Sequence, residues 1–432
     1  MREHLRVGID ARMNGNHFHG AAMTTIALIR ELCATSTDTE KYSILTSDHD
    51  AAWVRTAVDD RAELLTSSAV EAGVPSRMKQ SIQKLPAVSN VAAFFDRNFP
   101  GHVRVAESDG AIEGAGLDVM HFTMQAGFRT HVPFIYQPHD LQHLHYPENF
   151  TRAERAWREA TYRTLCQDAA AIAVMTEWGK RDLVVKFGLP PNKVTVIPWA
   201  PLISQPRDRQ DDSSVLRKYA ITGPFLLYPA QTWPHKNHIN LIRAISVLKN
   251  SGLDLTLICT GRCNELHPNI EREMRRLKLE NIVRFLDFVP HSHMAALYRS
   301  CRALVFPSKF EGWGLPVTDA MHAGVPVVCS NLAVLREQTA EAAQTFDPND
   351  VDAMADAIAR VWQDEALRTE LVALGKQRAR LFTWRRTADS YRQLYRRVAK
   401  DAGIRRSEPE HFPQIAIHAP KAGRAPAQAG GA

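Results

Sequence analysis

One stretch of the sequence, residues 305–321, combines glycines and acids in an order that could bind an anionic ligand. The stretch begins as an apolar strand, which ends at Pro307. A loop that contains Gly312 and Gly314 follows, and then a helix with Pro316 in its first turn. Unpaired N–H groups and the positive end of the helix dipole both point into such a loop. The glycines let the backbone approach a phosphate closely because they carry no Cβ. The stretch therefore predicts a phosphate site.

The two acids of this stretch stand at its opposite ends. Glu311 lies at the mouth of the loop, and Asp319 lies eight positions later, inside the helix. One carboxylate can therefore contact a ligand above the loop while the other contacts its far end. The alternative interpretation is that both are ordinary surface acids of an α/β protein, and the acids alone do not decide between the two.

Two further side chains could take part in such a site. Lys236 stands beside a helix start that follows the strand predicted at 225–228, and the helix dipole disfavours a cation there unless an anion is bound. Its alternative role is that of a surface lysine whose stem covers apolar side chains. His139 follows the strand predicted at 133–136, at the strand end where open α/β sheets bind ligands, although many loop histidines have no function.

Alternating strands and helices must position these residues. In the first half, the predicted strands are 5–10, 42–46, 117–122, 133–136, 171–175 and 194–198. Residues 1–205 therefore predict a Rossmann-like domain, although Gly15 and Gly20 do not form the GxGxxG pattern of dinucleotide sites. The polar, proline-bearing stretch 198–216 predicts a linker. Residues 213–383 repeat the alternation and predict a second Rossmann-like domain, so the fold class is α/β.

Three segments outside the core of these domains carry predictions of their own. Residues 384–400 predict a last helix, and residues 407–432, rich in Pro, Ala and Gly, predict a disordered tail. Residues 74–85 place apolar side chains at helical spacing with basic ones between them. This pattern predicts either an ordinary surface helix or a segment that contacts an anionic membrane or a lipid-linked acceptor.

Composition limits the class of protein. A chain of 432 residues with 45% hydrophobic and 23% charged residues can fold into two domains, and it has no apolar run that could span a bilayer. It also begins without a signal-peptide pattern, so we expect a cytoplasmic protein, at most peripheral on the inner face of the membrane. Six cysteines do not make a disulfide framework, and Cys259 and Cys263 lack the partners of a zinc site. A net charge of +6 without a basic and aromatic stripe argues against nucleic acid as a partner.

The central stretch resembles glycosyltransferase family 4, whose members are retaining enzymes of the GT-B fold. The resemblance rests on Phe306-Pro307-Ser308, Glu311-Gly312-Trp313-Gly314-Leu315-Pro316, Asp319-Ala320-Met321 and Gly324-Val325-Pro326, and on the sequence Pro-His-Lys-Asn that ends at Asn237. It implies two Rossmann-like domains that face each other across a cleft. The acceptor would bind to the first domain and the nucleotide sugar to the second, and the helix at 384–400 would cross back to the first domain.

The resemblance also implies roles for single residues. The catalytic pair would be Glu311, which holds the hydroxyls of the transferred sugar, and His139, which lies beside that sugar. Lys236 would contact the diphosphate and Asp319 the ribose. The rest of the implied donor-binding set is Gln231, Gly312, Trp313, Gly314, Leu315, Gly20 and Val289.

Three positions depart from the family pattern. Asp319 stands where the family has its second glutamate. Gln231 stands five residues before Lys236, where the family commonly has an arginine, and Arg262 is a candidate to replace that cation. Gly20 is followed by alanine, where a second glycine is frequent in the family.

Taken together, the residues and the resemblance predict a retaining, metal-independent hexosyltransferase. Its donor would be a nucleotide sugar, with GDP-mannose as the most specific expectation, and its acceptor a glycan or a lipid-linked molecule in surface-polysaccharide synthesis. We expect no cofactor and no metal, because no acidic cluster has spacing suited to Mg²⁺ and Lys236 with the loop N–H groups would stabilise the leaving diphosphate. The alternatives are a GT-B nucleotide-sugar epimerase and a non-catalytic nucleotide-sugar-binding protein.

Overall fold

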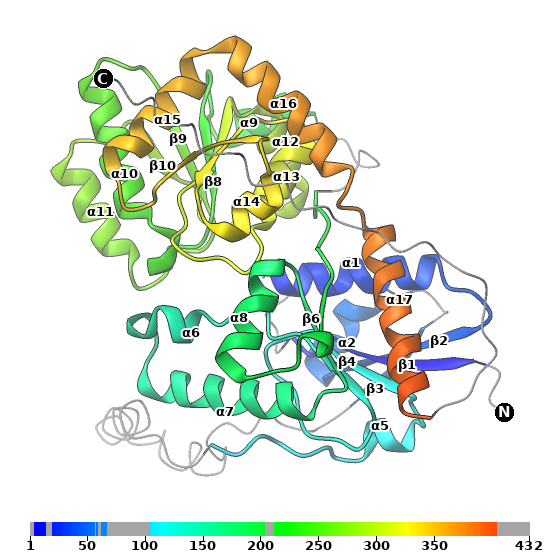
Figure 1. Ribbon diagram of the computed structural model, residues 1–432. Helices are drawn as coiled ribbons and strands as arrows, with labels where there is room; N and C mark the ends of the chain where they lie inside the picture. Colours follow the sequence, from blue (N-terminus) through cyan, green and yellow to red (C-terminus); the bar gives the residue numbers. More distant parts are fainter. Residues whose placement is uncertain are drawn as a thin grey trace, which may run out of the picture.

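The computed structural model describes residues 4–13, 20–56, 58, 62–66, 103–203 and 211–403. Within them the chain forms two parallel β-sheets, each packed against helices, and the two resulting domains face each other (Figure 1). The predicted helix at 74–85 and the predicted tail at 407–432 lie outside the described residues. No helix of the described part is long and apolar enough to cross a bilayer.

The first sheet has seven strands in the order β3-β2-β1-β4-β5-β6-β7, and each neighbouring pair is parallel. The strands are β1 (Leu5–Asp10), β2 (Glu40–Thr46), β3 (Ala62–Thr66), β4 (Val119–Phe122), β5 (Phe134–Tyr136), β6 (Ala171–Val174) and β7 (Val194–Val196). Successive side chains pack into different clusters: Val119 joins one apolar core and Met120 the other. Both faces of the sheet are therefore buried, which explains why its strands read as continuous apolar runs.

Helices of the first domain connect these strands. They are α1 (Gly20–Ala34), α2 (Asp48–Arg55), α5 (Ala111–Gly114), α6 (Gln142–His145), α7 (Arg152–Asp168) and α8 (Glu177–Phe187), with the 3-10 turns η1 (Pro147–Asn149) and η2 (Pro191–Lys193). Side-chain caps mark two of the starts. Thr151 and Glu154 form a reciprocal capping box before α7, and the Thr176 hydroxyl accepts from the N–H of Gly179 at the start of α8.

The second sheet has six parallel strands in the order β10-β9-β8-β11-β12-β13. They are β8 (Leu226–Pro229), β9 (Leu257–Thr260), β10 (Val283–Phe285), β11 (Ala303–Phe306), β12 (Val327–Ser330) and β13 (Ala343–Phe346). Its helices are α9 (Asp212–Lys218), η3 (Pro234–Lys236), α10 (His238–Asn250), α11 (His267–Arg276), α12 (His291–Ser300), α13 (Leu315–Ala323), α14 (Ala333–Thr339), α15 (Val351–Gln363) and α16 (Glu365–Ala379).

Strand order locates the ligand-binding edge of each sheet. The order reverses between β1 and β4 in the first sheet and between β8 and β11 in the second. In open α/β sheets the loops at the carboxyl ends of the strands, next to such a reversal, form the crevice that binds ligands. The loops after β8 and β11 carry Lys236 and Glu311, so the fold brings two distant parts of the sequence to one place.

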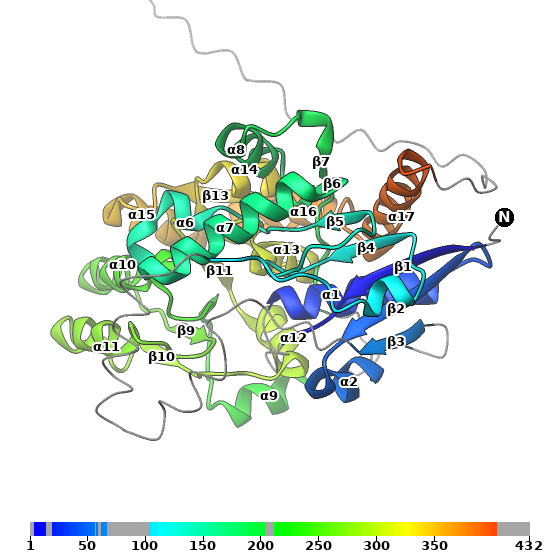
Figure 2. The ribbon, with the colours of Figure 1, turned by 90° about the horizontal axis from the view of Figure 1, so that it is seen from below.

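The last helix, α17 (Trp384–Asp401), packs on the first domain, as predicted. It contacts α1, β4 and β5, and Figures 1 and 2 both show it on the first domain. Its Tyr391 and Tyr395 are buried in the apolar core that α17 shares with α1 and the first sheet. The helix is amphipathic, and this apolar face accounts for its position. The GT-B arrangement, including the crossing of the C-terminal helix, is therefore present.

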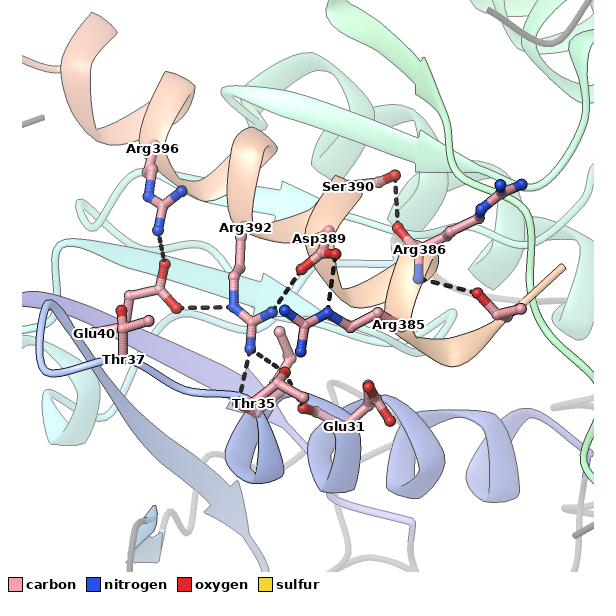
Figure 3. Close-up of polar contacts among 12 residues, drawn as sticks. Glu31, Thr35, Thr37, Glu40, Arg385, Arg386, Asp389, Ser390, Arg392 and Arg396 are labelled. Carbon is pink, nitrogen blue, oxygen red and sulfur yellow. Dashed lines mark hydrogen bonds and ion pairs between the residues drawn. The ribbon is translucent and has the colours of Figure 1, made fainter. Parts of the chain in front are cut away.

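A buried ion pair fixes α17 on this surface (Figure 3). Nε of Arg392 donates to Oε2 of Glu40 at 2.9 Å, and Arg396 pairs with the other carboxylate oxygen. The Glu40 side chain is 1% exposed, and Arg392 donates further to the hydroxyl of Thr35 at 2.6 Å. Because a buried charge left without its partner is costly, this pairing selects one position of α17 against α1 and β2.

Candidate active site

A cleft of about 570 Å³ lies between the carboxyl edges of the two sheets and is lined by both domains. Every predicted site residue lines it, namely Gly20, His139, Gln231, Lys236, Val289, Glu311, Gly312, Trp313, Gly314, Leu315 and Asp319. The fold thus assembles the whole predicted set, and the role of each member stays a prediction.

Lys236 and Glu311 form an ion pair inside the cleft. Nζ of Lys236 lies 2.5 Å from Oε1 of Glu311, and the two side chains are 18% and 11% exposed. Nζ also lies 5.5 Å from the centre of the Phe306 ring, so an aromatic face adds to the attraction on the cation. The carboxylate neutralises the lysine here, and an incoming phosphate would compete with Glu311 for the same ammonium group.

Two glycines shape the loop that carries Glu311. Gly314 caps α13 with a φ of 116°, and a Cβ there would lie 2.7 Å from Cδ2 of Leu335, so other residues are excluded by backbone conformation and by space. A Cβ on Gly312 would lie 2.8 Å from the carbonyl oxygen of His139. The close approach that Gly312 allows is thus to the backbone of the opposite domain, a contact that the predicted phosphate role does not include.

His139 lies on the first-domain side of the cleft in an unusual conformation. Its φ of 68° is rare for a residue with a side chain and marks local strain. Its Nε2 donates to the carbonyl oxygen of Thr123 at 2.8 Å, and its ring packs edge-on against Trp199. Burial lowers the pKa of His139, so the ring is neutral and Nδ1 is a hydrogen-bond acceptor. A neutral acceptor suits contact with a sugar hydroxyl.

Asp319 contacts the linker between the domains. Its Oδ1 accepts hydrogen bonds from the N–H groups of Leu202 at 2.7 Å and Ile203 at 3.2 Å. The carbonyl oxygen of Leu202 accepts in turn from Nε2 of His291 at 2.8 Å, so two second-domain side chains hold this peptide. Asp319 also lines the cleft, and its predicted ribose contact remains to be tested.

Burial raises the pKa of Asp319 from its ordinary value of 3.8 to about 7, and the two backbone hydrogen bonds only partly oppose this effect. The folded chain therefore keeps this proton at pH values where the unfolded chain releases it, so stability falls as the pH rises from about 4 to about 7. Asp319→Asn keeps an amide oxygen for both N–H groups and does not titrate. The difference in melting temperature between Asp319→Asn and the wild type should therefore be more favourable to the variant at pH 8 than at pH 5. The change should correspond to a few kcal/mol of unfolding free energy. A difference that does not vary with pH would contradict this assignment.

Phe310, next to Glu311, inserts into the first domain. Its ring is 6% exposed and lies 5.2 Å from His145, 5.9 Å from Tyr146 and 5.8 Å from Trp178, measured between ring centres. The Tyr146 hydroxyl also donates to the carbonyl oxygen of Lys309 at 3.2 Å. The loop that carries Glu311 is thus held by first-domain side chains.

A second contact between the domains lies close by. The carboxylate of Glu337 accepts from the N–H groups of Glu177 at 2.5 Å and Trp178 at 3.1 Å, at the positive end of α8. Burial raises the pKa of Glu337 while these bonds oppose the effect. A carboxylate of one domain thus caps a helix of the other, which supports the arrangement that Phe310 also stabilises.

Phe310→Ala should separate the Glu311 loop from the first domain. We expect turnover to fall by about tenfold or more while nucleoside-diphosphate affinity, which depends on the second domain, changes little. Trp178→Ala removes the facing ring, so the double variant should lose less than the product of the two single effects. Steady-state kinetics and calorimetry of the three variants measure this, and full turnover in Phe310→Ala would refute the proposed docking.

Some lining residues had no signal in the sequence. The cleft is also lined by Trp199, Leu202 and Ile203 of the linker and by Trp233, Phe288, His291 and Met294 of the second domain. The sequence of the linker is polar and rich in proline, which indicates only a connection between domains. Its contribution to the wall of the cleft was therefore not predicted. Trp233 and Phe288 are 46% and 42% exposed, unusual values for large apolar side chains.

Two predicted donor-binding side chains have protein partners. Oε1 of Gln231 accepts from Nε1 of Trp233 at 3.1 Å and from Asn264 at 3.4 Å. Trp313 is 4% exposed and packs edge-on against Phe382. Among the described residues, no group of three or more His, Cys, Asp or Glu side chains is placed to hold a metal ion.

Known families match both halves of the chain. The family described as "Glycosyltransferase Family 4" matches residues 91–200, and "Glycosyl transferases group 1" matches residues 213–378. The "O-antigen chain mannosyltransferase B" of Escherichia coli is 29% identical over 263 residues, which cover 59% of this chain and 69% of that protein. The "D-inositol 3-phosphate glycosyltransferase" of Corynebacterium glutamicum (strain R) is 28% identical over 281 residues, covering 61% of this chain and 66% of that protein.

A longer relative matches over a shorter stretch of the chain. The "Serotype-specific mannosyltransferase WbdA" of Escherichia coli is 31% identical over 179 residues, 40% of this chain and 22% of that protein. The chain thus spans about two thirds of the first two relatives and about a fifth of the third.

Solved structures show the same fold. The structure of "Anabaena Alr3699/HepE in complex with UDP and glucose" has a TM-score of 0.64 at 17% identity, covering 91% of this chain and 100% of that one. That of "WaaG, a glycosyltransferase involved in lipopolysaccharide biosynthesis" has a TM-score of 0.62 at 12% identity, covering 90% and 99%. With its two domains, its cleft and both family matches, the chain belongs to the family 4-like glycosyltransferases of the GT-B fold.

Proposed function

We propose that this glycosyltransferase moves a hexose from a nucleotide sugar to a glycan or lipid-linked acceptor with retention of configuration. The observation that carries the proposal is the position of the Lys236–Glu311 pair at the start of α13, in one cleft with His139 of the opposite domain. The names of the O-antigen mannosyltransferase relatives support mannose, from GDP-mannose, and surface-polysaccharide synthesis. A lipid-linked acceptor would bring the enzyme to the inner face of the membrane.

In this proposal the diphosphate of the donor lies against Lys236 and the N–H groups at the start of α13. The bond between the sugar C1 and the diphosphate oxygen breaks, and the electron pair leaves with the diphosphate. The acceptor oxygen forms a bond to C1 from the same face, and its proton passes to a phosphate oxygen of the donor. Lys236 stabilises the negative charge that develops on the leaving group.

The remaining residues position the donor. Glu311 and Nδ1 of His139 accept hydrogen bonds from hydroxyls of the transferred sugar. The ribose lies near Asp319, whose Oδ1 is shared with the linker, and the base lies near Val289. Arg262 lines the same cleft and could supply the cation that Gln231 does not. Together these contacts fix the sugar between the domains.

A panel of nucleotide sugars tests the donor assignment. The correct donor should raise the melting temperature, because a ligand that binds the folded state stabilises it by mass action. GDP-mannose is expected to give the largest shift and, with an acceptor, to release GDP. An epimerase of the same fold would instead convert the sugar with no acceptor present. No shift with any donor would contradict the proposal.

Transfer should continue in excess chelator. In the proposed site Lys236 and the helix start neutralise the diphosphate, so no divalent cation is needed for this step. The measurement is the initial rate of transfer with and without EDTA, and the expected rates agree within about twofold. Loss of activity that Mg²⁺ or Mn²⁺ restores would overturn the metal-independent mechanism.

A further inference from the structure

Trp233 is exposed inside the cleft, although tryptophan side chains are mostly buried in folded proteins. The side chain is 46% exposed, lines the cleft, and belongs to the residue directly before η3. A large apolar side chain that stays open to solvent in a concave site marks a place where a ligand binds. The proposed donor contacts do not include Trp233, so its exposed face remains open to another group.

A hydrogen bond fixes the orientation of this indole ring. Nε1 of Trp233 donates to Oε1 of Gln231 at 3.1 Å, and Nδ2 of Asn264 donates to the same oxygen at 3.4 Å. An indole N–H can only donate, so the amide oxygen of Gln231 must face it. Gln231, which stands where the resembled family commonly has an arginine, therefore orients the ring of Trp233.

The backbone that carries the ring is held tightly. The N–H of Thr232 donates to the carbonyl oxygen of Arg262 at 3.3 Å, and the Thr232 hydroxyl accepts from the N–H of Asn264 at 2.6 Å. A Cβ on Gly261 would lie 2.7 Å from the carbonyl carbon of Ala230, so the loops after β8 and β9 pack directly against each other. The exposed indole is thus part of a fixed wall of the cleft.

The turn that follows Trp233 is joined to the reaction centre. Its last residue, Lys236, pairs with Glu311. The carbonyl oxygen of His235 accepts from the N–H of Lys309 at 2.7 Å, and the carbonyl oxygen of Lys309 accepts from the Tyr146 hydroxyl of the first domain at 3.2 Å. The indole therefore precedes a turn that lies against the loop of Glu311 and, through this loop, against the first domain, where the acceptor is expected to bind.

We propose that Trp233 is an acceptor-binding residue whose indole face stacks on a sugar ring of the acceptor, and that Gln231 is the positioning residue that orients it. The face of an indole is apolar and carries negative charge density, and the C–H groups on one face of a sugar ring pack well against it. Because Gln231 occupies the indole N–H, the ring offers the ligand its face. The inference rests on the proposed function, since it needs a glycan acceptor, and it adds how this acceptor is recognised.

Strand order favours an acceptor sugar over the donor base on this ring. A nucleobase can also stack on tryptophan. The base is proposed to lie near Val289, in the loop after β10, and β9 separates β10 from β8 in the sheet. At a strand spacing of about 4.8 Å, the loops after β8 and β10 begin roughly 10 Å apart. The neighbour of β8 on its other side is β11, which leads to Glu311.

The test measures binding of methyl glycosides of mannose, glucose, galactose, N-acetylglucosamine and rhamnose to the full-length protein, with and without GDP, by saturation-transfer NMR. Trp233→Ala should weaken the bound glycoside by about tenfold or more, as for other central aromatic contacts. Trp233→Phe should retain most of the affinity because it keeps an aromatic face. Leu381→Ala is the control, since Leu381 is 43% exposed but lies outside the cleft. GDP affinity should be the same in all these proteins.

The positioning role of Gln231 has its own measurement. In a proton–nitrogen correlation spectrum, the indole N–H signal of Trp233 is the one that Trp233→Phe lacks. This signal should move in Gln231→Leu, and it should move in the wild type when the glycoside is added. Gln231→Leu should also bind the glycoside more weakly while its melting temperature stays that of the wild type, which a purely structural role would not produce.

Each outcome decides the proposal. Glycoside binding that is lost in Trp233→Ala and kept in Trp233→Phe supports it. Equal glycoside affinity in Trp233→Ala and Leu381→Ala, or no binding of any glycoside, would overturn it. Weaker GDP binding with unchanged glycoside binding in Trp233→Ala would assign the ring to the nucleotide and also overturn it. If the wild type does not bind GDP but still binds a glycoside through Trp233, the donor assignment fails and this inference stands.

Discussion

Glu311→Gln is expected to lower turnover at least about a hundredfold and to leave nucleoside-diphosphate affinity unchanged or tighter. A residue that holds the sugar stabilises the transition state, so its loss reduces kcat more than donor binding. The structure explains why nucleoside-diphosphate affinity is expected to stay unchanged or become tighter. Glu311 pairs with Lys236 at 2.5 Å, and a neutral glutamine would compete less strongly with phosphate for that lysine.

Kinetics with the best donor and calorimetry with the nucleoside diphosphate measure the two parts. Glu280→Gln, an exposed acid of the same domain, is the control and should behave like the wild type. Wild-type turnover in Glu311→Gln would remove Glu311 from the catalytic set. A large loss of nucleoside-diphosphate affinity would assign it to the nucleotide instead of the sugar.

Lys236→Ala is expected to weaken the nucleoside diphosphate by about ten- to a hundredfold, the range for a charge-assisted hydrogen bond to phosphate. The unphosphorylated nucleoside should bind as before, because it lacks the groups that Lys236 contacts. The variant also leaves the carboxylate of Glu311 without its partner, in a position where its charge repels the diphosphate.

Titrations of nucleoside and nucleoside diphosphate into both proteins separate these effects. Lys249→Ala, whose Nζ donates to a backbone carbonyl on the surface of the same domain, serves as the control. If the ratio of the two affinities is the same in Lys236→Ala as in the wild type, the lysine does not contact phosphate.

The fold was largely predictable because its strands are buried on both faces. Such strands read as uninterrupted apolar runs, as at Ala303–Phe306, and parallel strands place the loops after them at one edge. The same rule explains why His139, Lys236 and Glu311, far apart in the sequence, were predicted together and line one cleft.

Contacts between distant segments were not predictable in this way. Phe310 reads as one more apolar residue before Glu311, and nothing local shows that its pocket lies on the other domain. The hydrogen bonds of Asp319 to the linker and the ion pair of Glu40 with Arg392 likewise depend on how the two domains and α17 pack against each other. These contacts are set by packing over long sequence separations, for which no periodic pattern exists.

The configuration of the product tests the central proposal most directly. The wild type is incubated with its α-linked donor, GDP-mannose in our proposal, and an acceptor, and the one-bond C1–H1 coupling of the new linkage is measured by NMR. The proposal predicts an α-linkage, because the acceptor attacks from the face that the diphosphate leaves. A β-linkage would contradict it, since inversion requires attack from the opposite face and a base placed there.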